Sequence, residues 1–176
     1  KMNKTFLLIP LIFILIILSF FYLLMIDRDP SKIPSQLLNK NVPIFESDLL
    51  LKNDKFISLE EIGEEKVLIN FFATWCKPCR DEHVFIKRFS NEIGIRVIGI
   101  NYKDNSEKAK IWLKNLGNPY SDIPVDKNGS IAIDWGVYGI PETFLVNSKG
   151  IIKYRHVGQI TEDVYKKINR LINDIQ

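Results

Sequence analysis

The chain has 176 residues, 46% of them hydrophobic, and a formal net charge of +3, which suits one globular domain with an additional segment. Lys1 and Lys4, two of the 24 basic residues, precede a long apolar run, so the rest of the chain is nearly neutral against 21 acidic residues. This balance does not favour nucleic-acid binding. The only cysteines, Cys76 and Cys79, are three positions apart, which excludes a disulfide framework that staples distant segments.

Residues 6–26 form an apolar run without a charged side chain. As a helix such a run is roughly 30 Å long, about the thickness of a bilayer core, so it predicts a transmembrane helix. The run ends in Tyr22, Leu23, Leu24, Met25 and Ile26 rather than in the small residues of a cleavage site, which predicts an uncleaved anchor.

Charges beside this run predict its orientation. Lys1 and Lys4 lie at one end, whereas Asp27, Arg28, Asp29 and Lys32 nearly cancel at the other. The positive-inside rule then places the N-terminus in the cytoplasm of a bacterial cell and the remainder in the periplasm, at the inner membrane. We expect a cytoplasmic end at 1–5, an anchor at 6–26, a linker with two prolines at 27–41, and a domain at 42–176.

The start of the domain shows signals of a β-hairpin and a short helix. Residues 44–45 and 55–58 are the expected strands, with Asn53 and Asp54 between them. Ser58, followed three residues later by Glu61, forms a capping box for a short helix that ends at Gly63.

The next segments alternate between strand and helix patterns. Nearly continuous apolar runs predict buried strands, and apolar side chains at helical spacing predict helices between them. A hairpin and a terminal helix capped by Thr161 follow. The expected fold is α/β, with a central mixed β-sheet flanked by helices. The expected strands are 66–72, 95–100, 143–146 and 151–156, and the expected helices are 77–91, 106–116 and a last one after Thr161.

The pair Cys76 and Cys79 is placed for thiol chemistry. A strand at 66–72 would deliver Cys76 to a helix N-terminus, where unpaired N–H groups and the helix dipole favour the thiolate. Cys76 is the expected exposed nucleophile, and Cys79, one turn later, is the less exposed resolving thiol of a redox disulfide. Pro78 is tolerated in a first helical turn, and the charge of Lys77 would lower the pKa of Cys76.

Other interpretations of the two cysteines are weaker. A zinc site would need two more ligands, and only His83 and His156 remain, so we expect no metal. Arg80 after Cys79 excludes a haem-attachment motif, and we expect no cofactor. An inert structural pair stays open. Neither histidine is favoured as catalytic, because His83 is equally explained as an exposed helix residue and His156 is expected on a strand away from the site.

Two motifs resemble the thioredoxin superfamily, namely WCKPC at 75–79 and GIP at 139–141. The second resembles the loop whose cis-proline packs against the dithiol, which implies that Pro141 is cis. Dispersed matches resemble more specifically the DsbE or CcmG type of cytochrome c biogenesis thiol:disulfide interchange protein. These are ATWC at 73–76, RDEH at 80–83, NYKD at 101–104, WLK at 112–114, LGNPY at 116–120, GVYGIPETFL at 136–145 and YRH at 154–156.

This resemblance implies a reductant in an oxidising compartment. Its targets would be the haem-binding thiols of apocytochrome c, directly or through another thiol protein of the maturation machinery, and its electrons would come from a DsbD or CcdA-type membrane reductase. A dithiol alone runs in either direction, according to its potential. A general anchored reductase of the TlpA or ResA type, and a non-catalytic escort of apocytochrome, are the alternatives.

The resemblance also suggests the residues that support the dithiol. Thioredoxins have a buried aspartate where this chain has Asn70, which cannot titrate, so Glu82 and Glu142 are the candidates for handling the proton. A solvated helix charge remains the alternative for Glu82. Trp75 would cover the dithiol and meet partners, whereas Trp112 and Trp135 are expected in the core. The substrate groove would be bordered by Gly136, Val137, Tyr138, Gly139 and Ile140.

Overall fold

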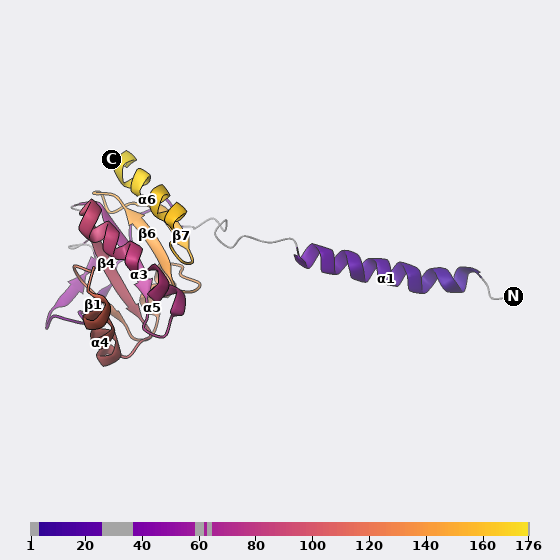
Figure 1. Ribbon diagram of the computed structural model, residues 1–176, viewed down its shortest axis with the longest axis horizontal. Helices are drawn as coiled ribbons and strands as arrows, with labels where there is room; N and C mark the ends of the chain where they lie inside the picture. Colours follow the sequence, from indigo (N-terminus) through magenta and orange to yellow (C-terminus); the bar gives the residue numbers. More distant parts are fainter. Residues whose placement is uncertain (1–3, 26–36, 59–61, 63–64, 176) are drawn as a thin grey trace. The chain divides into compact units, whose positions relative to one another are not determined.

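The computed structural model describes residues 4–25, 37–58, 62 and 65–175, and the chain divides into two units, Lys1–Ile33 and Pro34–Gln176. The first unit contains helix α1, Lys4–Met25 (Figure 1). Within the described part of the chain, no helix combines the length and the apolar character needed to cross a membrane. The predicted linker falls largely on residues 26–36, which lie outside the described residues.

The second unit is built on a five-stranded sheet in the order β5-β4-β3-β6-β7. Strands β3 and β4 are parallel, whereas β6 is antiparallel to both β3 and β7. The predicted mixed sheet is therefore confirmed. The strands are β3 (Val67–Phe72), β4 (Arg96–Tyr102), β5 (Val125–Asp126), β6 (Glu142–Val146) and β7 (Ile152–Val157).

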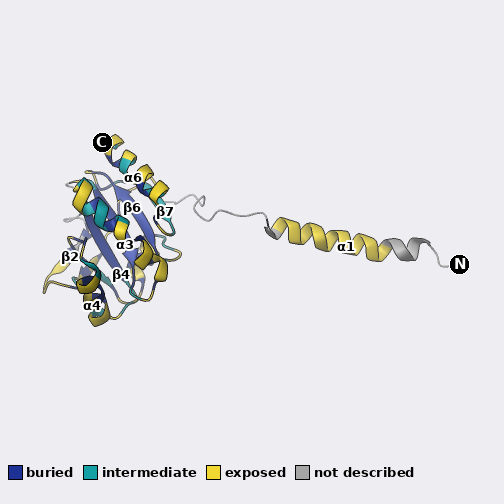
Figure 2. Ribbon diagram, in the orientation of Figure 1, coloured by how far each residue is buried: buried dark blue, intermediate teal, exposed yellow. Residues whose placement is uncertain are grey.

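Helices cover one face of this sheet, and the opposite face is covered by the N-terminal hairpin together with α5, Ser130–Asp134. Figure 2 shows strands β4 and β6 buried between these layers. The alternation of side chains along β3 explains the two cores, since Leu68 and Phe72 point to one and Ile69 and Phe71 to the other. The helices of the first face are α3 (Lys77–Arg88), α4 (Ser106–Leu116) and α6 (Glu162–Asp174).

The predicted hairpin is present as β1 (Glu46–Asp48) paired antiparallel with β2 (Lys55–Ile57). Its first strand begins at Glu46, later than the predicted 44–45, because the Phe45 N–H bonds to the side chain of Ser58 rather than to its backbone carbonyl. The Phe45 N–H donates to Ser58 Oγ over 2.9 Å, and its carbonyl accepts the Ser58 N–H over 3.1 Å. The capping-box helix that was expected to end at Gly63 falls on residues 59–61 and 63–64, outside the described residues.

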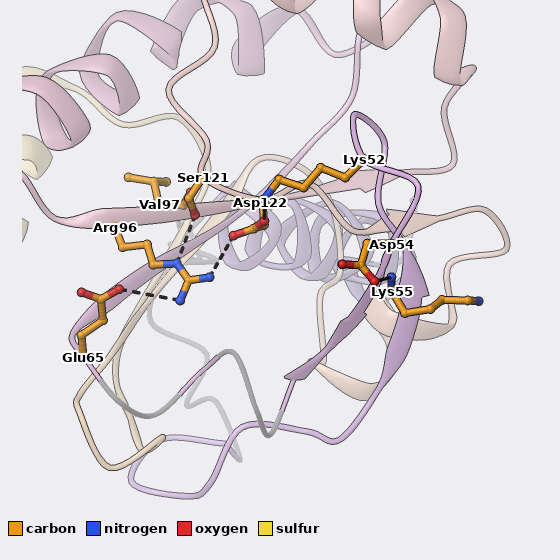
Figure 3. Close-up of polar contacts among 8 residues, drawn as sticks. All are labelled: Lys52, Asp54, Lys55, Glu65, Arg96, Val97, Ser121 and Asp122. Carbon is orange, nitrogen blue, oxygen red and sulfur yellow. Dashed lines mark hydrogen bonds and ion pairs between the residues drawn. The ribbon is translucent and has the colours of Figure 1, made fainter.

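The loop after β1 is tied to the sheet by a charge cluster (Figure 3). Asp122 accepts hydrogen bonds from Lys52 in this loop and from Arg96 on β4. The two cations hold the pKa of Asp122 below its usual value, against the opposing effect of burial. This contact fixes the hairpin loop beside the segment that leads into β5.

Three elements differ from the sequence-based expectation. The helix predicted over 77–91 ends as an α-helix at Arg88 and continues as a short π-helix, Phe89–Ile93, which closes on Gly94 with a left-handed φ of 74°. Strand β5 and helix α5 were not predicted. Both are too short to show a periodic pattern.

Candidate active site

The first cysteine lies where strand β3 passes into helix α3. Cys76 is the N-cap of α3, with extended backbone, and its sulfur accepts a hydrogen bond of 3.1 Å from the Cys79 N–H. Pro78 occupies the first turn, where its missing N–H costs no intrahelical bond. The helix N-terminus thus presents N–H groups to the Cys76 sulfur, the arrangement that stabilises a thiolate.

Cys76 and Cys79 are joined in a disulfide. Cys79 is 2% exposed and Cys76 is 5% exposed, so the expected order of exposure holds. The expectation of an openly exposed nucleophile is wrong for this disulfide state, because both residues are covered. Part of the cover comes from the loop that precedes β6.

That loop ends in a cis peptide between Ile140 and Pro141, as the resemblance implies. The Ile140 carbonyl oxygen lies 3.7 Å from Cys76 Sγ, so the loop and the dithiol are in direct contact. Tyr138 in the same loop is 73% exposed. Of the predicted groove residues, Ile140 therefore lies next to the Cys76 sulfur, and Tyr138 presents a large aromatic ring to solvent.

Glu82 is buried on α3, one turn beyond Cys79. Its Oε1 accepts a 2.9 Å hydrogen bond from Asn70 Nδ2, and its Oε2 accepts a 2.8 Å bond from the Ile160 N–H. Both donors favour the ionised carboxylate, but burial has the larger effect and raises the pKa of Glu82 to about 8. The alternative of a solvated helix charge is wrong.

Tyr120 completes this network; the sequence placed it in the LGNPY motif at 116–120 but gave it no role at the site. Its hydroxyl donates to Asn70 Oδ1 over 3.0 Å, which leaves the Asn70 amide nitrogen facing Glu82 and Thr143. The Tyr120 ring stacks on Phe72 with centroids 4.7 Å apart. Burial raises the pKa of Tyr120 well above its usual value, so the hydroxyl stays a donor.

Gly99 on β4 makes room for that ring. A Cβ at Gly99 would lie 2.7 Å from the Tyr120 ring and 2.9 Å from Phe72, closer than real side chains approach one another. A glycine inside a buried strand is the sequence signal that could have indicated the close approach of another group.

Glu142, the other candidate acid, is also fully buried, but it has a charged partner. Its Oε2 accepts from Arg155 Nε over 2.8 Å, and its Oε1 accepts from the Tyr138 N–H over 2.9 Å. Burial raises the pKa of Glu142, while the Tyr138 N–H and Arg155 oppose this rise. The structure places Glu142 in an ion pair that holds the loop before Pro141, and its prediction as a proton-handling group stays a prediction.

Comparisons with known proteins agree with this geometry. A family model described as Redoxin matches residues 37–171. The thiol:disulfide interchange protein DsbE of Tatumella citrea is 43% identical over 171 residues, covering 94% of this chain and 91% of that protein. The DsbE of Escherichia coli strain K12 is 42% identical over 171 residues, covering 94% and 92%. The chain belongs to the redoxin family, as a protein of the DsbE type.

Solved structures show the same fold for this DsbE-type protein. A candidate DsbE from Chlorobium tepidum superposes with a TM-score of 0.69 at 22% identity, covering 78% of this chain and 96% of that one. A DsbF homologue from Corynebacterium diphtheriae gives a TM-score of 0.67 at 19% identity, covering 77% and 87%. The named relatives and the Cys76–Cys79 pair make the chain a thiol:disulfide oxidoreductase.

Two further residues that were predicted to support the dithiol of this DsbE-type protein, Trp75 and Lys77, lie at the surface. Trp75 is exposed, and its Nε1 donates to the Lys103 carbonyl over 3.2 Å. Lys77 forms an exposed ion pair of 2.7 Å with Asp81, so its charge is directed to that carboxylate and to solvent rather than to the sulfurs. The predicted influence of Lys77 on Cys76 stays a prediction.

The histidines and the other tryptophans lie in structural positions. His83 is buried rather than exposed, because it packs edge-on against Trp112 at 4.5 Å and its Nε2 lies 2.8 Å from the Gly117 carbonyl. Burial lowers its pKa, so the ring is neutral and Nε2 carries the proton toward Gly117. His156 lies on β7 with Nε2 3.1 Å from the Gln159 carbonyl. Trp112 and Trp135 are in the core, as predicted.

Proposed function

We propose that this protein is an anchored periplasmic reductant of the haem-binding cysteines of apocytochrome c, acting directly or through another thiol protein of cytochrome c maturation. The observation that carries the proposal is the buried Glu82, one helical turn beyond Cys79 and bonded to the Asn70 that replaces the thioredoxin aspartate. A base in this position favours resolution of a mixed disulfide, which is the step that releases a reduced target. The pathway is supported by the resemblance of the dispersed motifs and by the DsbE relatives.

The reaction begins from the dithiol form. The Cys76 thiolate attacks one sulfur of the target disulfide, and a mixed disulfide forms as the first target thiolate leaves. Cys79 then attacks the Cys76 sulfur and expels the second target thiolate, and its proton passes to the fraction of Glu82 that is ionised, which near neutral pH is the smaller fraction because the pKa of Glu82 is raised to about 8. The target has gained two electrons, and the protein is left with the Cys76–Cys79 disulfide.

A new cycle needs two electrons from outside the domain. In an oxidising compartment the pair stays oxidised unless a dedicated donor reduces it. A DsbD or CcdA-type transmembrane reductase, which would attack the Cys76–Cys79 disulfide with its own thiolate, fits this requirement.

The anchor is part of the same proposal. Its support is the sequence, in which residues 6–26 contain no charged side chain and follow Lys1 and Lys4. The full chain should stay with membranes after an alkaline wash, and protease added to spheroplasts should remove the domain. Release by the wash, or protection from the protease, would contradict the anchor or its orientation.

The decisive experiment for the function compares single cysteine variants of the full chain in cells. Cys76→Ser should abolish c-type cytochrome assembly, because it removes the nucleophile and leaves Cys79, which is only 2% exposed, as the remaining thiol of the pair. Normal assembly in this strain would exclude the reductant and favour the escort. Ser130→Ala, a change at an exposed position of α5, is the matched control and should assemble cytochromes normally.

The second variant identifies the target. Cys79→Ser removes the resolving thiol, so the mixed disulfide through Cys76 should accumulate and can be isolated under acid-quenched, non-reducing conditions. Apocytochrome c or a maturation protein in the adduct supports the proposal. A broad range of unrelated periplasmic proteins would instead support a general reductase of the TlpA or ResA type.

A further inference from the structure

Residues 138–140 form the loop whose Ile140 carbonyl contacts the Cys76 sulfur, and the N–H of Tyr138 in this loop is held by a side chain rather than by the backbone of the fold. Just before them, the Gly136 N–H bonds to Ile133 and the Val137 N–H to Ala132, both in α5. Further along, the Tyr138 N–H donates to the Glu142 carboxylate instead. The conformation of the loop beside Cys76 thus depends on where the Glu142 side chain is held.

Arg155 holds that side chain and also the start of the loop. From β7 its Nε donates to Glu142 Oε2 over 2.8 Å, and its Nη2 donates to the Gly136 carbonyl over 2.9 Å. Its guanidinium lies 5.0 Å from the centre of the exposed Tyr138 ring. The Arg155 side chain therefore contacts the start of the loop at Gly136, the Tyr138 ring within the loop, and the Glu142 carboxylate.

Arg155 is placed to act only through this loop. Its side chain is 5% exposed, so a docked protein would not reach it. It lies opposite Phe144 in the β6–β7 pairing and also packs over the Phe144 ring at 5.6 Å, which fixes its position on the sheet. The loop meets the reactive pair at the Ile140 carbonyl, which lies 3.7 Å from Cys76 Sγ.

We infer that Arg155 is a positioning residue for partner docking. Together with Glu142 it holds residues 136–140 ready to receive an extended, cysteine-containing segment of a protein, with the Ile140 main chain beside Cys76 and the Tyr138 ring open to solvent. The inference rests on the proposed function in that this segment belongs to apocytochrome c or a maturation thiol protein. In this proposal the Arg155–Glu142 pair serves to recognise the protein target and does not transfer protons.

The physical reason is preorganisation. A loop that must be ordered during binding weakens affinity, because the free energy of ordering offsets part of the free energy that docking provides. Arginine suits the position because its planar fork bonds a carboxylate and a carbonyl at once, which a lysine ammonium on a flexible stem does less well. The buried pair thus carries out the ordering when the protein folds, before the partner arrives.

The test compares a protein disulfide with a small one, using the reduced full chain in detergent. The substrates are oxidised apocytochrome c, oxidised insulin as an unrelated protein disulfide, and 5,5′-dithiobis(2-nitrobenzoate). The variants are Arg155→Lys and the charge-neutral pair Arg155→Met with Glu142→Gln, which avoids leaving a buried carboxylate unpaired. Lys153→Met, an exposed change on the same strand, is the matched control.

We expect the double variant to raise the KM for apocytochrome c about 10-fold with little change in kcat, since docking is weakened but the dithiol is intact. Arg155→Lys should lie between the double variant and the wild type. The rate toward the small disulfide should fall much less than the rate toward the protein, and Lys153→Met should match the wild type with every substrate.

Two outcomes would overturn the inference. The first is an equal loss toward the protein and the small disulfide, which would show a general effect on the dithiol. The second is an unchanged KM in both Arg155 variants. If the wild type reduces insulin but not apocytochrome c, the proposed function is wrong, and the insulin KM then decides the role of Arg155 by the same criteria. If the double variant does not fold, Arg155→Lys retains the charge and supplies the same comparison.

Discussion

Two buried glutamates near the dithiol have opposite surroundings. Among the described residues, the donors to Glu82 on α3 are both neutral, namely the Asn70 amide and the Ile160 N–H. Glu142, at the start of β6, is bonded by the guanidinium of Arg155. Both are at most 1% exposed, so burial alone does not separate them. The charge of the bonding partner separates them. Glu82 has neutral partners and is free to gain or lose a proton, whereas Glu142 is held in an ion pair with Arg155.

The largest expected effect comes from removing the partner of Glu142. Arg155→Met leaves a buried carboxylate without its cation, and we expect a loss of about 3–5 kcal/mol in the free energy of unfolding at neutral pH. Urea unfolding at equal detergent concentration measures it. A second change, Glu142→Gln, should recover much of the loss, because it removes the unpaired charge.

If Arg155→Met is no less stable than Lys153→Met, the ion pair does not hold the loop, and the contrast between the two glutamates fails. The double variant, Arg155→Met with Glu142→Gln, separates the effect of the unpaired charge from the effect of the lost side-chain volume. A purely steric effect of losing the arginine side chain would persist after Glu142 is made neutral.

The next effect concerns Glu82 and pH. Because its pKa rises from about 4.5 in the unfolded chain to about 8 in the folded protein, the folded state binds more protons between these values. The contribution of Glu82 to stability is therefore greatest below pH 4.5, falls as the pH rises toward 8, and is constant above it. The loss across this window is on the order of a few kcal/mol.

Unfolding at several pH values should show this decline in the wild-type protein and a flatter profile in Glu82→Gln. The glutamine keeps the shape but loses one hydrogen bond, so the slope with pH is the informative quantity rather than the absolute stability. Identical slopes for the two proteins would mean that Glu82 is not the titrating group.

The smallest effect tests what orients Asn70. Tyr120→Phe removes the hydroxyl that bonds Asn70 Oδ1 and leaves this buried acceptor unpaired, so we expect a loss of about 1 kcal/mol in the free energy of unfolding. The freed amide can also turn away from Glu82, which would raise the pKa of Glu82 further. A pH profile unchanged from the wild type would limit Tyr120 to packing against Phe72.

Local patterns in the sequence were sufficient for most of the fold. The apolar run over 66–72, the helical spacing after it and the Thr161 cap each correspond to an observed element within one or two residues at its start. The short strand β5 and helix α5 left no periodic signal. Residues 59–61 of the predicted capping-box helix lie outside the described residues.

The dithiol and the cis-proline followed from motifs, whereas the partners of the two acids did not. Tyr120 bonds Asn70 from 50 positions away, and Arg155 bonds Glu142 from the neighbouring strand, 13 positions later. Such pairings are fixed by strand order and register, which a single sequence does not specify at the level of side chains. The sequence therefore indicated two candidate acids but not which of them forms an ion pair with a cation.

The most direct test of this contrast is to follow the glutamate carboxyl groups by NMR in the oxidised protein labelled with ¹³C-glutamate. We expect a carboxyl signal that titrates near pH 8, is lost in Glu82→Gln, and persists in Glu142→Gln. A high-pH titration that persists in Glu82→Gln and disappears in Glu142→Gln would contradict it and would make Glu142 the acid that handles the proton.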